Sequence, residues 1–107
     1  MSRNYEWLFG KLSQAVGVLV SNPGDVRNRV WVASTYLMQI SPEAVPLECR
    51  EDIEWIQHML TRYSPGPLDD SAIRATYRRT RNKTASKIAE RVWRAYLVYD
   101  FAMRSRA

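Results

Sequence analysis

Clusters of proline and glycine divide this chain into a few uninterrupted segments, and they constrain its fold more than any other feature. The clusters lie at 22–24, 41–42, 45–46 and 64–67. Because both residue types disfavour a helix interior, each cluster marks a connection. The segments between them repeat apolar residues with the 3.6-residue period of a helix, and none sustains the two-residue alternation of a strand. The sequence therefore predicts an all-α protein.

Five helices account for the segments between these connections. We expect them over 4–20, 23–40, 46–63, about ten residues that end at 80 or 81, and 83–104. The second helix has apolar residues on two sides, which is typical of a central helix. The boundary at Arg81 and Asn82 is the weakest, since neither residue strongly forbids one continuous helix.

Polar residues at the expected helix starts are candidate N-caps. A side-chain oxygen there accepts a hydrogen bond from a backbone N–H that has no partner within the helix. The expected caps are Asn22, followed by Pro23 at the first helical position, Asp69 or Asp70, and Asn82.

The length and composition fit one globular domain over 1–107. A chain of 107 residues buries about two thirds of its unfolded surface. Nearly half of the residues are hydrophobic, and four Trp and six Tyr are far more than a disordered chain carries. Short connections favour antiparallel neighbours, so we expect a single-domain bundle of five helices.

Charge is distributed unevenly along the chain. Residues 71–107 hold ten Lys or Arg and two acids, whereas residues 1–70 hold six Lys or Arg and nine acids. The halves therefore carry +8 and −3, and the net charge of +5 hides this division. Such asymmetry indicates an anionic partner, with nucleic acid as the first choice and a membrane surface as the second.

The cations of the basic half are expected to form helical faces. On the fourth helix, positions 74, 78 and 81 lie within about 60° of each other, and on the fifth, positions 83, 87, 91 and 94 span about 80°. Only Glu90 is a local counter-charge, so these faces repel themselves and become favourable against phosphates. The candidate nucleic-acid-binding residues are Arg74, Arg78, Arg79, Arg81, Lys83, Lys87, Arg91 and Arg94.

Two other interpretations of these charges stay open. The cations can form a solvated face, or the acids at the start of the third helix, from Glu48 to Glu54, can neutralise them within the fold or across a dimer. A helix-turn-helix over 80–90 would read bases with Lys83, Thr84, Ser86 and Lys87, but the usual turn glycine is absent. We therefore expect contacts to the DNA or RNA backbone with little base preference.

The end of the fifth helix is unusually apolar, with one charge in residues 95–103. Trp93, Leu97 and Phe101 recur at i, i+4 and i+8 on a side that differs from the expected core face. Such a stripe is either central in the bundle or covered by a partner. We expect a partner interface, because aromatic residues dominate the energetics of protein interfaces, and a homodimer or other protein partner.

Residues with catalytic or ligand-binding chemistry are scarce. The single cysteine, Cys49, and the single histidine, His58, are nine residues apart and fall on opposite sides of one helix. The sequence has no metal-binding spacing and no glycine-rich phosphate loop. We expect no catalysis, no cofactor and no metal.

These observations predict a non-catalytic accessory protein that binds nucleic-acid backbone. The alternative is an adaptor module that docks through the apolar end of the fifth helix, and peripheral membrane binding is less favoured. One cysteine excludes an internal disulfide and fits the cytoplasm. The longest aliphatic run, 15–20, is far shorter than the ~20 residues of a transmembrane helix.

Overall fold

A computed structural model describes residues 3–106, and it confirms the prediction of an all-α bundle. Of residues 3–106, 78% are helical; they form five α-helices in one globule and contain no strand. The elements are α1 (Arg3–Ser21), α2 (Val26–Leu37), the short 3₁₀ helix η1 (Pro42–Ala44), α3 (Leu47–Leu60), α4 (Ala72–Arg79) and α5 (Asn82–Arg106).

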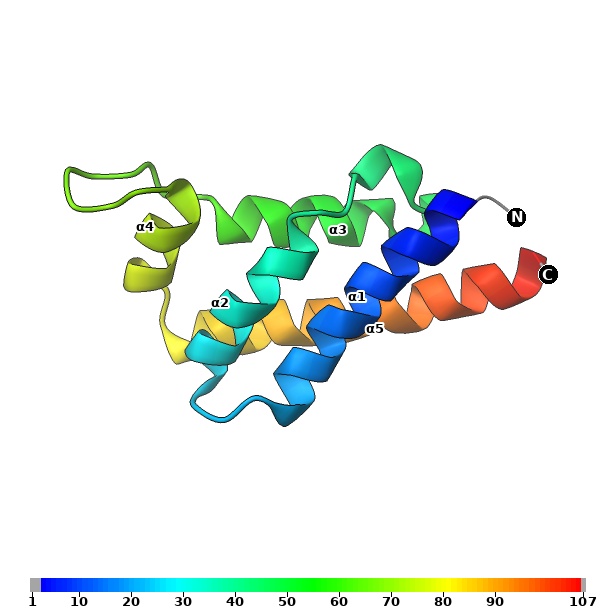
Figure 1. The fold of residues 1–107 in the computed structure, drawn as a ribbon, viewed down its shortest axis with the longest axis horizontal. Coiled ribbons are helices and arrows are strands. Elements are labelled where there is room, and N and C mark those ends of the chain that lie inside the picture. Colours follow the sequence, from blue (N-terminus) through cyan, green and yellow to red (C-terminus); the bar gives the residue numbers. More distant parts are fainter. Residues whose placement is uncertain (1–2, 107) are drawn as a thin grey trace.

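The helices form two antiparallel pairs and one short connecting helix. α1 and α2 run side by side in opposite directions, and α3 runs antiparallel to α5, which spans the length of the molecule (Figure 1). α4 lies at one end, between α3 and the start of α5. α5 packs against α1, α2 and α3, and α2 contacts the other four helices, so both are central in the packing.

The core lies where these helices meet. Every helix turns small or aliphatic side chains inward, and α5 adds the large aromatic ring of Tyr99, whose hydroxyl donates a hydrogen bond of 2.7 Å to the carbonyl oxygen of Tyr5. This bond satisfies a polar group that would otherwise be costly to bury. The largest fully buried side chains besides Tyr99 include Leu12, Leu37, Ile40, Ile53, Ile56, Ile88 and Val92.

The prediction that Asn22 caps the second helix is wrong. Gly24 has a φ of 106°, in the left-handed region that favours glycine, so the turn continues beyond the proline. Asp25 is the N-cap of α2, and its carboxylate accepts a hydrogen bond of 2.9 Å from the backbone N–H of Asn28. The helix therefore begins three residues later than expected.

The expected caps of the last two helices are also wrong. Ser71, and neither of the preceding aspartates, caps α4, because its hydroxyl accepts a hydrogen bond of 3.1 Å from the N–H of Arg74. α5 begins at Asn82, which is a helical residue and not a cap. The break between α4 and α5 is nevertheless present, and α4 ends at Arg79, slightly earlier than expected.

Candidate nucleic-acid interface

The joint between α4 and α5 is built by buried hydroxyl groups. Thr80 leaves the helical conformation, with φ −85° and ψ 131°, and its hydroxyl donates a hydrogen bond of 2.6 Å to the carbonyl oxygen of Thr76. The same hydroxyl accepts a hydrogen bond of 3.1 Å from the guanidinium of Arg62. These bonds satisfy polar groups at the break and fix where α5 begins.

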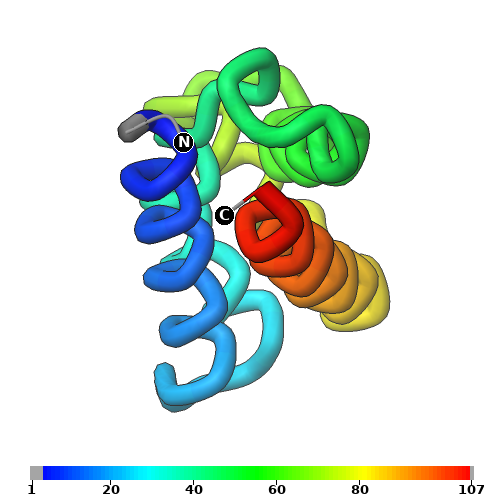
Figure 2. The backbone as a smooth tube through the Cα atoms, turned by 90° about the vertical axis from the view of Figure 1, so that its right-hand side faces the viewer, coloured from blue at the N-terminus to red at the C-terminus, as the bar shows by residue number. Residues whose placement is uncertain are grey.

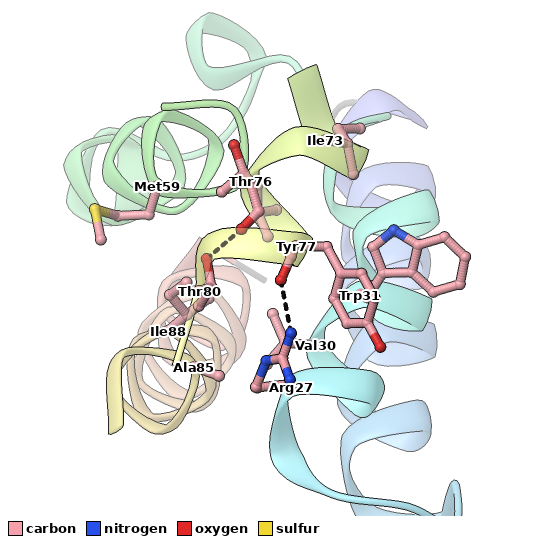
Figure 3. Close-up of a pocket in the computed structure, with 11 residues that line it drawn as sticks. Arg27, Val30, Trp31, Met59, Ile73, Thr76, Tyr77, Thr80, Ala85 and Ile88 are labelled. Atoms are coloured by element: carbon pink, nitrogen blue, oxygen red, sulfur yellow. Dashed lines mark hydrogen bonds between the residues drawn. The ribbon is translucent and has the colours of Figure 1, made fainter. Parts of the chain in front are cut away.

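Arg27 of α2 ties this joint to the rest of the bundle. Its guanidinium donates a hydrogen bond of 3.0 Å to the carbonyl oxygen of Tyr77 (Figure 3). Its backbone N–H donates to the side-chain oxygen of Asn82 at 3.4 Å. The guanidinium also lies 5.0 Å from the centre of the Tyr77 ring, which packs on Trp31. The small pocket beside these residues has a volume of about 20 Å³, enough for about one water molecule and too small for a cofactor.

Two of the predicted cations of α5 are occupied by an acid of α3. Asp52 is buried, and its carboxylate accepts hydrogen bonds from Arg91 and, at 2.9 Å, from Arg94. Arg91 also stacks over the Trp55 ring at 4.8 Å. The sequence interpretation in which the acidic start of the third helix neutralises the fifth inside the fold therefore holds for this pair of arginines.

A second ion pair joins the far ends of the same two helices. Arg106 of α5 donates a hydrogen bond of 3.0 Å to the carboxylate of Glu48, and this contact lowers the pKa of that carboxyl group. Ion pairs therefore connect antiparallel α3 and α5 at two places along their length, one at Asp52 and one at Glu48. Glu90 is consequently not the only counter-charge available to the cations of α5.

The cations of α4 do not form the expected face with Arg81. Because α4 ends at Arg79, Arg81 lies outside it and leaves the helical stripe of Arg74 and Arg78. Arg78 donates two hydrogen bonds, of 2.7 and 3.1 Å, to Asp69, and these bonds are the main reason why the pKa of Asp69 is lowered. Arg79 stacks over the ring of Tyr63 at 5.2 Å.

Four of the eight predicted cations remain exposed, with no side-chain hydrogen bond, ion pair or aromatic-ring contact among residues 3–106: Arg74, Arg81, Lys83 and Lys87. Arg74 lines an open groove between α2 and α4, together with Trp31 and Met38. The other three lie at the joint and on the first turns of α5. We refer to Arg81, Lys83 and Lys87 as the basic corner.

The basic corner runs against the preference of a helix terminus. The N-terminal end of a helix carries a partial positive charge, so acids are favoured there, and α3 follows this rule with Glu48 in its first turn. The first turn of α5 contains no acid, and Lys83 lies within it. Like charges therefore accumulate at a helix end where they are destabilising unless an anion approaches.

The apolar stripe of α5 is exposed and is not part of the core. The side chains of Trp93, Leu97 and Phe101 are 51%, 48% and 72% exposed, whereas the core face of α5 is formed by Ala85, Ile88, Val92, Ala95, Tyr99 and Ala102. The alternative that placed this stripe at the middle of the bundle is therefore wrong. We refer to Trp93, Leu97 and Phe101 as the α5 stripe.

The cysteine and the histidine do not form a catalytic pair. Cys49 is fully buried, and its thiol donates a hydrogen bond of 3.3 Å to the carbonyl oxygen of Pro46. Burial is the largest cause that raises the pKa of Cys49 to about 12, so the thiol stays protonated near neutral pH. His58 is exposed on the same helix.

Sequence reasoning did not single out Asp52 or Asp69 as a partner of a particular arginine. Asp52 was one of several acids of the third helix considered as an internal counter-charge, and Asp69 was a candidate cap. Each binds arginine, at separations of 39 and 42 residues for Asp52 and 9 for Asp69. The only local signal for Asp52 is its position directly before Ile53, at the edge of the core face.

No match was found among protein-family models, curated proteins or solved structures. Within residues 3–106, none of the helices has the length and apolar character needed to cross a bilayer. The same residues bring together no group of three or more His, Cys, Asp or Glu side chains that would hold a metal ion.

Proposed function

We propose that this chain is a non-catalytic accessory protein that binds the phosphate backbone of nucleic acid at the basic corner. The observation that carries the proposal is the accumulation of Arg81, Lys83 and Lys87 at the positive end of α5 without an acidic partner. Proteins depart from such local rules mainly at functional sites, where a ligand compensates the cost. A phosphodiester backbone supplies closely spaced anions that suit these exposed cations.

The internal ion pairs reduce the number of predicted cations that are available to bind phosphate. Arg78, Arg91 and Arg94 already bind carboxylates, so a phosphate would have to compete for them. The three cations of the basic corner are free of this competition. Contacts to about three phosphates predict weak binding with little sequence preference, because backbone contacts carry no base information.

Salt dependence is the direct test of this proposal. Fluorescence anisotropy with duplex DNA should give a slope of log affinity against log salt of about −3, since each neutralised phosphate contributes about −0.9. Replacing the three cations of the basic corner by Ala should bring the slope close to zero. The matched single variants are Lys83→Ala and Arg74→Ala, which remove one charge each. Only Lys83→Ala should flatten the slope, by about one unit.

Three outcomes would contradict the proposal. One is the absence of wild-type binding to single-stranded and double-stranded DNA and RNA at low salt. Another is an unchanged salt slope in the triple variant. The third is binding to vesicles of anionic lipid without binding to any nucleic-acid probe, which would assign the basic corner to a membrane surface instead.

A second candidate function is that of a protein-interaction module. The specific observation in its favour is the exposure of the α5 stripe, which places two aromatic rings and a leucine on one open face. Exposed apolar clusters of this kind are typical of protein interfaces.

A further inference from the structure

The α5 stripe lies on the side of its helix that faces away from the bundle. The end-on view shows α5 with α3 on one side and α1 on the other, and a third side that no other helix covers (Figure 2). Leu97 lies near the middle of this outward face, because it is about half a turn around the helix from the buried residues Val92 and Tyr99.

A stack of aromatic rings holds the largest member of the stripe in place. The ring of Trp93 lies parallel to that of Tyr96, at 5.5 Å between centres, and Tyr96 in turn stacks on Phe9 of α1 at 5.1 Å. The Trp93 side chain is therefore ordered before any partner arrives. An ordered side chain loses less conformational entropy on binding, which favours its use as an anchor.

Charges on the same face indicate what the partner is. Glu90 lies seven residues before Leu97, and Arg104 lies seven residues after it, so both share the outward face with only about 20° of drift each. Both are exposed, and Arg104 has only a surface contact of 3.0 Å with Asp100 of its own helix. A surface pair of this kind contributes little and is easily exchanged.

These charges are complementary to a second copy of the same face. In an antiparallel pair with Leu97 on the two-fold axis, Glu90 lies level with Arg104 of the second copy, and Arg104 lies level with its Glu90. Trp93 lies level with Phe101 of the second copy in the same arrangement. A parallel pair would bring like charges together at each level, and it would also place the two basic corners side by side.

We propose that the protein forms an antiparallel homodimer through α5, with the two copies of Leu97 in contact on the axis. A two-fold interface uses the same patch on both copies, and the charges of this patch are complementary to those of a second copy in the antiparallel register. The inference does not rest on nucleic-acid binding. It concerns the C-terminal half of α5, whereas the basic corner lies at the N-terminal end.

The size of the stripe sets the expected strength of the dimer. Side chains of this kind cover roughly 150–250 Å² each, so the exposed fractions leave on the order of 300 Å² of apolar surface per copy. With its charged flanks, the contact lies at the lower end of specific interfaces, which bury about 800 Å² per partner. We therefore expect a dimer that dissociates on dilution into the micromolar range.

Sedimentation across a range of protein concentrations tests the assembly. The mass of the wild type should rise from the 12.5 kDa of one chain toward twice that value as the concentration increases. Leu97→Glu should raise the dissociation constant at least about tenfold, because it places two carboxylates on the axis. Leu47→Glu, at an exposed leucine on α3, is the matched control and should dimerise as the wild type does.

A charge exchange tests the antiparallel register. Glu90→Arg alone and Arg104→Glu alone should each weaken the dimer about tenfold, since two attractive pairs become repulsive. The double variant should restore the dissociation constant to within about threefold of the wild type. Far-UV circular dichroism of each variant separates this effect from a loss of helix at the end of α5.

Disulfide cross-linking through a cysteine at position 97 tests the dimer without placing a charge on α5. Leu97→Cys should form a disulfide-linked dimer under mild oxidation, whereas Thr35→Cys, on an exposed part of α2, should not. The native Cys49 does not compete because it is buried. A wild type that stays monomeric at the highest concentration would overturn the proposal. So would a double variant that is no better than the single ones, or equal cross-linking of the two cysteine variants.

The failure of this proposal can be distinguished from the failure of the proposed function. The triple Ala variant of the basic corner should lose nucleic-acid binding and still dimerise. Leu97→Glu should instead weaken dimerisation and leave nucleic-acid binding unchanged, when binding is measured with a short probe that reaches only one basic corner.

Discussion

Asp52→Asn tests the ion pairs that hold α3 against α5. The Asp52 side chain is 4% exposed, and it accepts hydrogen bonds from Arg91, which is 22% exposed, and from Arg94, which is 64% exposed. Asparagine has nearly the same size and keeps one acceptor oxygen, so the substitution changes the charge more than the packing. Two guanidinium groups would then face each other without their shared counter-ion.

The exposure of the arginines determines the expected loss of stability. Removing one partner of a fully buried ion pair costs about 3–5 kcal/mol. Arg94 is mostly in water and recovers most of its solvation, whereas Arg91 remains mostly shielded. The free energy of unfolding should therefore fall by about 2 kcal/mol, which corresponds to a decrease in the melting temperature on the order of 10 °C.

Urea unfolding followed by far-UV circular dichroism measures this loss, with Glu54→Gln as the control. Glu54 is an exposed acid on the same helix, so its neutral variant should stay within about 0.5 kcal/mol of the wild type. A loss below about 0.5 kcal/mol for Asp52→Asn would refute the argument. Equal losses in the two variants would show that only the overall charge of α3 matters.

Two further predictions concern the backbone of the first two helices and the buried thiol. A Cβ atom added at Gly10 or Gly17 meets no atom within 4 Å, so each Gly→Ala change should stabilise the protein by about 0.8–1 kcal/mol. Gly24→Ala should instead destabilise it by about 1 kcal/mol, because φ is positive there; urea unfolding that ranks the three alike would contradict this. Burial raises the pKa of Cys49 from 9.0 to about 12. The stability that the neutral thiol provides is therefore fully present below pH 9.0, and it decreases as the pH rises from 9.0 to about 12. Native protein at pH 8 should react with a thiol reagent far more slowly than protein in urea, and equal rates would disprove the shielding.

Most of the fold could be predicted because helices are determined by local patterns. Apolar residues with a 3.6-residue period identify a helix wherever they occur, and proline and glycine mark its limits. The errors occur where several polar residues compete for one cap. Asn22 and Asp25 are both good caps by residue type, and only the left-handed conformation of Gly24 selects the second.

The candidate site could be predicted only in part because ion pairs connect distant segments. The spacing of Arg91 and Arg94 correctly indicates a common helical face, but it contains no information about an acid 39 residues away. The prediction that Arg81 shares a helical face with Arg74 and Arg78 was wrong for a similar reason. Thr80 is held outside the helix by Thr76 and by Arg62, and the second of these lies in another part of the chain. Conversely, the α5 stripe was recognised because its periodicity is local.

In the proposed antiparallel dimer, the basic corner and the α5 stripe would lie in different halves of the same helix. Lys83 precedes Leu97 by fourteen residues, so the two copies of Lys83 in the dimer are separated by twenty-eight residues of helical rise, or about 40 Å. Each corner thus extends beyond the end of the partner's helix and remains open, whereas a parallel dimer would have brought both corners together and repelled itself. A nucleic acid that contacts both corners of the antiparallel dimer has to span about twelve base pairs at 3.4 Å each. In this proposal, unpaired cations at one end of α5 and exposed aromatic residues in its other half would keep self-association and anion binding on separate parts of a single helix.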